Sequence, residues 1–250
     1  MPIRLSKGVK ALLLGSFLAF VIQQVGDQFL GTHLMSYFAL TPRAVFYQHW
    51  IWQIFTASFM HYDVMHLFFD LLMLAFIGSE LEFAWGTARF LKYYFFCTIS
   101  AALLYLGMGA IFSSSLALSP MLGASSGIYA LLLAYGLIFG ERILLFMMLF
   151  PMKAKHFVWV LALVELMTTI FSGAGKSSIA QLGGMVCGFF YLWVQATLLR
   201  SRRNRTTSAG LQGFLSRWKK RKSKHLKLVV NNDRGFDSDE ESRNKPKTWH

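Results

Sequence analysis

Two serines begin an apolar segment in the sequence Gly123-Ala124-Ser125-Ser126-Gly127. A serine hydroxyl becomes a nucleophile when a neighbouring base takes its proton. Imidazoles and carboxylates serve as such bases, and the chain offers several of them in or beside other apolar segments. The central question is which of these groups the fold brings to Ser125.

The composition indicates a protein that crosses a membrane several times. Of 250 residues, 55% are hydrophobic, and the mean hydropathy is +0.45. A helix that spans a bilayer needs about 20 mostly apolar residues. We predict an all-α fold, a bundle of six transmembrane helices, at 11–31, 64–84, 90–112, 122–140, 156–171 and 179–199. A further apolar run, 143–150, is too short to cross, and we expect it to lie at the cytoplasmic interface.

The distribution of lysine and arginine predicts the orientation. Basic residues cluster in the N-terminal segment, in the second-to-third and fourth-to-fifth connections, and after Leu199. Basic segments stay on the cytoplasmic side, so both termini are expected there. We expect a cytoplasmic N-terminus at 1–10, a membrane domain at 11–199, and an integral, multi-pass protein of a bacterial cytoplasmic membrane.

The chain after Leu199 is strongly basic, with 15 basic and 5 acidic residues. In 200–230, apolar residues recur mostly at helical spacing between lysines and arginines, which predicts an amphipathic segment on anionic lipid. Nucleic acid or another partner is the alternative, although we expect no nucleic acid. The polar stretch 231–250 is predicted to be disordered. Cys97 and Cys187 lie in predicted spans and indicate packing rather than a disulfide.

The predicted topology gathers polar residues near one face of the membrane. With both termini inside, the second, fourth and sixth helices begin at the outer face. Near their starts lie His61, His66 and Asp70, then Ser125 and Ser126, then Gln181. Polar groups that converge inside a membrane mark a functional site by default.

In its order of motifs, the chain resembles the rhomboid family of intramembrane serine proteases over about 44–199. The marks are 52–56 (WQIFT), His61 with His66, Gly78 with Glu82, Gly86, Arg89 and Phe90, Gly123-Ala124-Ser125 with Tyr129, and Gly183-Gly184 with Gly188. The resemblance implies that Ser125 is the nucleophile and that Gln181 stands in place of the base histidine. It implies that His66 and Asp70 hold the oxyanion, and that Gly123, Ser126, Tyr129 and His61 surround the substrate. No cofactor and no metal site are expected.

The departures from the family pattern fall on the chemistry. Gln181 has no basic lone pair to offer, Asp70 replaces an asparagine, and Ser126 replaces a glycine. An ionised Asp70 would repel a developing oxyanion, whereas a protonated one could donate to it. Among other groups, His61, His49, His156, His225 or Asp70 could replace the missing base.

Several of these residues also have a purely structural interpretation. Gly184 and Gly188 form a G-x-x-x-G pattern that lets helices approach closely. Ser125 and Ser126 could hydrogen-bond within a helix pair, and His66 and Asp70, four residues apart, could form an ion pair. Glu165 has no evident partner in the sequence.

The sequence therefore favours a rhomboid-like pseudoprotease that binds transmembrane segments of client proteins. The alternative is an active intramembrane serine endopeptidase, a hydrolase that uses Ser125 to cleave membrane proteins near the outer face. A transporter or channel is disfavoured, because the polar groups cluster at one depth rather than along a path.

Overall fold

The computed structural model describes residues 4–111, 118–122, 124–146, 150–171 and 178–199. The chain divides into two compact units, Met1–Val194 and Gln195–His250. The predicted segments 200–230 and 231–250 lie outside the described residues.

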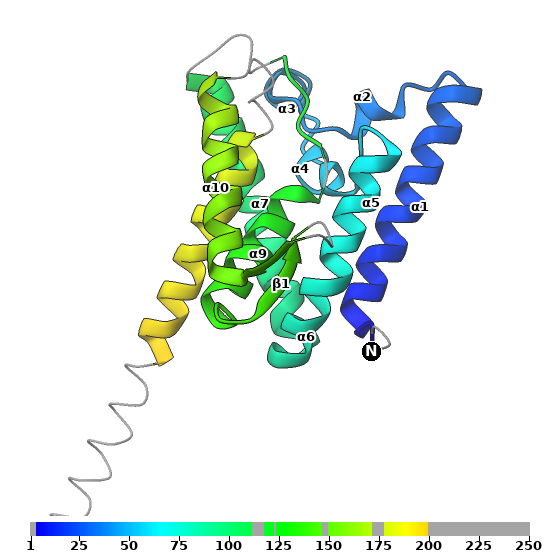
Figure 1. Ribbon diagram of the computed structural model, residues 1–250. Helices are drawn as coiled ribbons and strands as arrows, with labels where there is room; N and C mark the ends of the chain where they lie inside the picture. The colour runs from blue at the N-terminus through cyan, green and yellow to red at the C-terminus, as the bar shows by residue number, and fades with distance from the viewer. Residues whose placement is uncertain (1–3, 112–117, 123, 147–149, 172–177, 200–250) are drawn as a thin grey trace, which may run out of the picture. The chain divides into compact units, whose positions relative to one another are not determined.

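The first unit consists mainly of long helices joined by short ones (Figure 1). Its elements are α1 (Lys7–Phe29), α2 (Leu34–Phe38), α3 (Pro42–Gln48), α4 (Gln53–Thr56), the 3-10 helix η1 (Ala57–Phe59), α5 (Val64–Met73), the π-helical turn η2 (Leu74–Gly78), α6 (Ser79–Trp85), α7 (Thr87–Ile111), α9 (Ser125–Ile138), β1 (Ile143–Phe146), β2 (Phe150–Lys153) and α10 (Ala154–Phe171). A further helix, Ser178–Leu199, follows α10 and is called the last described helix below.

Five of the described helices are long and apolar enough to cross a membrane. They are Lys7–Phe29, Val64–Trp85, Thr87–Ile111, Ala154–Phe171 and Ser178–Leu199. The prediction of a full fourth span at 122–140 is corrected, because α9 has only 14 residues. At 1.5 Å per residue, α9 is about 21 Å long, which is shorter than the roughly 30 Å hydrocarbon core.

The segment after α9 also differs from the prediction. Where an all-α fold was predicted, β1 and β2 pair as antiparallel strands, Ile143 with Lys153 and Phe146 with Phe150. Beside it, Glu141 accepts hydrogen bonds from Lys153, at 2.8 Å, and from Lys155. Pairing the two strands satisfies backbone groups that a short irregular segment would leave open.

The core lies around α7 and α9. Buried aromatic residues of α7, Phe90, Tyr93 and Tyr94, pack with apolar residues of α1, α6 and α9. The Tyr93 hydroxyl donates to the backbone oxygen of Ala130 at 2.8 Å, which ties α7 to α9. This core holds the start of α9, and therefore Ser125, at a fixed position.

A carboxylate from α6 caps the first helix. Glu82 accepts backbone hydrogen bonds from Gly8 and Val9, both at 2.8 Å, and hydroxyl hydrogen bonds from Ser6 at 2.5 Å and Thr87 at 2.6 Å. The first N–H groups of a helix lack partners within the helix and favour a negative charge. This cap explains why α1 begins at Lys7 rather than at the predicted residue 11.

The segment between α1 and α5 forms a layer of short helices at one end of the long ones (Figure 1). Leu40 and Met121 form an antiparallel bridge, with backbone hydrogen bonds of 3.1 and 2.8 Å. The bridge anchors the chain four residues before Ser125. The rings of Tyr37, Trp50 and Trp52 stack on one another in this layer, a composition typical of a membrane interface.

The glycines of the last described helix pack as the G-x-x-x-G pattern predicts. A Cβ atom on Gly184 would lie 2.2 Å from the backbone oxygen of Ser126, and one on Gly188 would lie 2.5 Å from the Tyr93 hydroxyl and 3.1 Å from Ala130. The helix therefore touches the backbone of α9 at Ser126. The packing role of these two glycines is confirmed.

Candidate functional site

Ser125 is the first residue of α9 and is buried. Its hydroxyl oxygen lies 2.9 Å from Nε2 of His66 and 3.2 Å from Oδ2 of Asp70, both on α5. Ser125 thus contacts one imidazole and one carboxylate. His66 was absent from the bases that the sequence suggested, because the family resemblance assigns it to the oxyanion.

The local sequence of α5 presents His66 and Asp70 to the serine. Asp63 precedes the helix, and its side chain accepts a hydrogen bond from the backbone N–H of His66 at 2.7 Å, a regular N-terminal cap. Residues four apart lie on one helix face, and Nε2 of His66 is 3.5 Å from Oδ2 of Asp70. The ion-pair geometry expected from the spacing is present, with Ser125 as a third member.

A second imidazole reaches the same carboxylate. Nε2 of His61 lies 3.5 Å from Oδ2 of Asp70, and the His61 side chain is fully buried. Its other ring nitrogen, Nδ1, is 3.1 Å from the backbone oxygen of Phe59. Gln23 of α1 holds the His61 backbone through two hydrogen bonds, at 2.8 and 3.2 Å. His61 therefore faces Asp70 and not the serine.

Gln181 contacts a carboxylate of α10. With its amide oriented so that both polar atoms are satisfied, its nitrogen donates to Glu165 at 2.6 Å from Oε2 and 3.1 Å from Oε1. The Tyr129 hydroxyl donates to the same carboxylate at 2.5 Å. These three residues join the last described helix, α10 and α9. Through this contact Gln181 belongs to the cluster around Glu165.

The other residues of the predicted site lie in different places: some belong to the polar clusters and others pack between helices. Ser126 is buried, and its hydroxyl has no hydrogen-bond partner within the described part of the chain. Gly127 packs against α7, where a Cβ atom would lie 2.5 Å from Thr98 and 2.7 Å from Tyr94. Gly123 lies outside the described residues. Of the residues predicted to surround a substrate, Tyr129 belongs to the Glu165 cluster and His61 to the Asp70 cluster.

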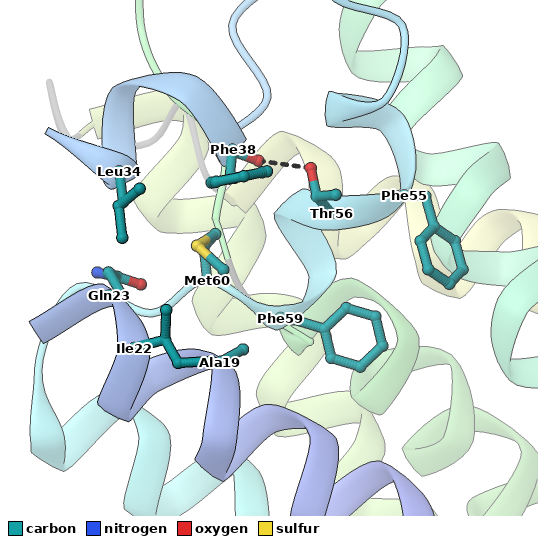
Figure 2. A pocket seen from close by; sticks show the side chains of 9 residues that line it. All are labelled: Ala19, Ile22, Gln23, Leu34, Phe38, Phe55, Thr56, Phe59 and Met60. Atoms are coloured by element: carbon teal, nitrogen blue, oxygen red, sulfur yellow. Dashed lines mark hydrogen bonds between the residues drawn. The ribbon is translucent and has the colours of Figure 1, made fainter. Parts of the chain in front are cut away.

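Gln23 also lines an apolar cavity of about 270 Å³ (Figure 2). The side chains that line it come from α1, α2, α4, η1 and Met60, and most are apolar. Figure 2 shows Thr56 with its hydroxyl on the backbone oxygen of Phe38, at 3.0 Å, so this polar group is already satisfied. The cavity has no free polar group to take part in chemistry and is separate from Ser125.

Two curated relatives are similar to this chain. One is the rhomboid protease GlpG of Enterobacter sp. (strain 638), 31% identical over 132 residues, which are 52% of this chain and 43% of the relative. The other is the rhomboid protease GlpG of Salmonella paratyphi A (strain ATCC 9150 / SARB42), 24% identical over 190 residues, which are 74% of this chain and 63% of the relative. The chain covers less than two thirds of either relative. It is distantly rhomboid-like.

A family model matches residues 8–215, which include all of the described helices except the first residue of α1. The family is eukaryotic by its description, so the expected bacterial cytoplasmic membrane is corrected, whereas the prediction of an integral multi-pass membrane protein is confirmed. Through this match the chain belongs to the family described as eukaryotic integral membrane protein (DUF1751).

Proposed function

We propose that this protein binds transmembrane segments of client proteins beside α5 and α9 and does not cleave them. The observation that supports this proposal is the contact of Gln181 with Glu165. The residue at the position of the family's base histidine is an amide that donates to a carboxylate. It can neither accept the serine proton nor protonate a leaving amine, and peptide cleavage by a serine nucleophile needs both steps.

The preserved scaffold fits a binding role. Gly184 and Gly188 still hold the last described helix against α9 and α7. Beside the Ser125 site, α5 presents Val64, Met65 and Phe68 on its exposed surface. Helices associate within a membrane by close packing and by hydrogen bonds between polar side chains. We expect an apolar client helix to contact this surface of α5.

The proposal is tested with photo-crosslinking residues in the full chain. One variant carries the crosslinker in place of Phe68 on α5, and its control carries it in place of Phe83 on α6, which is similarly exposed. Both are reconstituted with a synthetic single-span peptide. We expect stronger crosslinking at position 68 and an intact peptide by mass spectrometry. Equal crosslinking at both positions would contradict the binding surface.

The same experiment distinguishes client binding without cleavage from the endopeptidase alternative. Cleavage of the peptide that disappears in Ser125→Ala would establish proteolysis and overturn the non-cleaving part of the proposal. The observation that keeps this alternative open is the 2.9 Å contact between Ser125 and His66.

A further inference from the structure

We infer that His66 is the general base of Ser125 and that this pair transfers acyl groups from carboxylic esters to the serine hydroxyl. This activity goes beyond client binding. It rests on the 2.9 Å distance between Oγ of Ser125 and Nε2 of His66, which is within the range for direct proton transfer.

The proton positions in the cluster follow from its contacts. Because a backbone carbonyl only accepts, Nδ1 of His61 carries the proton that it shares with Phe59. Nε2 of neutral His61 is then a bare acceptor, and it faces Oδ2 of Asp70 at 3.5 Å without another donor. His61 therefore takes no part in the contacts of Ser125.

Two acceptors compete for the serine hydrogen, Nε2 of His66 at 2.9 Å and Oδ2 of Asp70 at 3.2 Å. The contact with His66 is the shorter of the two. The serine O–H then donates to Nε2 of His66 at 2.9 Å. In this arrangement His66 is ready to take the proton.

The reaction needs Ser125, His66, the ester and one water molecule. Oγ of Ser125 attacks the ester carbonyl carbon while its proton moves to Nε2 of His66. The bond from the carbonyl carbon to the alkoxy oxygen breaks, and the alkoxide takes a proton from His66 and leaves as an alcohol. The acyl group remains on Ser125 until water hydrolyses it.

Esters suit this site better than peptides. After the first step, the proton on Nε2 of His66 lies close to both Ser125 and Asp70, because Asp70 contacts the same nitrogen at 3.5 Å. A peptide must have its amine protonated as it leaves, whereas an alkoxide is a better leaving group and depends less on that proton. An ester therefore places the smaller demand on His66 as an acid.

The test uses the full chain in detergent micelles, labelled with a fluorophosphonate probe and assayed with a p-nitrophenyl ester. We expect labelling that disappears in Ser125→Ala. In His66→Gln, the amide can still donate a hydrogen bond but cannot act as a base, so the labelling rate should fall by about 100-fold or more. The control is His156→Gln, an exposed histidine of α10, which should label like the native chain.

Asp70→Asn distinguishes the two possible bases. If His66 is the base, labelling should persist, because the substitution removes only a competing acceptor of the serine proton. If Asp70 is the base, labelling should be lost, because an amide cannot take that proton. Loss of labelling in Asp70→Asn, retained labelling in His66→Gln, or an unlabelled native chain would each overturn the inference. Thermal unfolding of every variant shows whether it is folded. Because client crosslinking at position 68 needs no proton transfer, it can succeed or fail independently of the labelling.

Discussion

The Oγ atom of Ser125 and the Nε2 atom of His66 lie 2.9 Å apart, although the two residues are 59 positions apart in the chain. The contact joins the first turn of α9 to the first turn of α5. It leaves Gln181 to the separate cluster with Glu165 and Tyr129. The site therefore consists of two polar clusters.

Gly184→Ala should weaken the packing of the last described helix. The added Cβ atom would lie 2.2 Å from the Ser126 backbone oxygen, which cannot move without shifting α9. We expect a loss of about 1–3 kcal/mol in the free energy of unfolding. Gly183→Ala is the matched control, because its nearest contact is 3.4 Å from a leucine side chain. Unfolding in a denaturing-detergent titration measures both, and equal effects would contradict the close approach.

Gln181→Ala should destabilise the Glu165 cluster. It removes the amide donor and leaves Tyr129 as the remaining side-chain donor to a buried carboxylate. A buried acceptor that loses its partner costs about 1–3 kcal/mol. Val186→Ala, at an exposed position of the same helix, is the control. A smaller effect for Gln181→Ala than for the control in the same titration would argue against the hydrogen bond.

Glu82→Gln should loosen the start of α1. The neutral amide keeps the size of the side chain but loses the charge that accepts hydrogen bonds from Gly8, Val9, Ser6 and Thr87. Hydrogen bonds to charged groups contribute about 1.5–3 kcal/mol. Hydrogen exchange of the amides at residues 8 and 9 should become faster, while exchange in the centre of α7 should not change. Unchanged exchange at both sites would rule out the cap.

Acid should release the ion pairs beside β1 and β2. Hydrogen bonds and charge from Lys153 and Lys155 lower the pKa of Glu141 from 4.5 to about 2. A lowered carboxyl pKa adds stability above the ordinary value, and this stability is lost as the pH falls through the folded value. Relative to the intrinsic rate at each pH, amide exchange in the two strands, 143–146 and 150–153, should therefore accelerate between about pH 4.5 and pH 2. Because Glu141 is exposed, the effect should be small, and Glu141→Gln should remove it.

The orientation inferred from charge can be tested on described residues. In a cysteine-free background, Tyr47→Cys should react with an impermeant thiol reagent from the outer side, and Ile143→Cys should not. Both side chains are well exposed, so the side of the membrane on which each one lies decides whether the reagent reaches it. Labelling of position 143 alone would reverse the topology.

The basic tail is tested as a peptide of residues 209–230. It should bind anionic vesicles and lose most of that binding at high salt, since each basic side chain near the surface contributes about 1 kcal/mol that salt screens. Equal binding to neutral vesicles would contradict an electrostatic role.

Local sequence patterns were enough to predict the membrane class, the approximate positions of the helices, and the close packing at Gly184 and Gly188. These features follow from local hydropathy and from residue size, which act along one segment at a time. It also indicated that Ser125 would meet polar residues of α5.

The pairing of the polar side chains could not be predicted in this way, because it depends on how the helices pack in three dimensions. Each residue turns a side chain by about 100° around its helix, so the choice between Ser125 and Glu165 as the partner of Gln181 depends on the rotation of several helices. Their rotation is set by the whole core around α7 and by contacts such as that of Gly184 with Ser126. The short α9 and the capped start of α1 likewise depend on residues distant in the chain, which local sequence patterns do not contain.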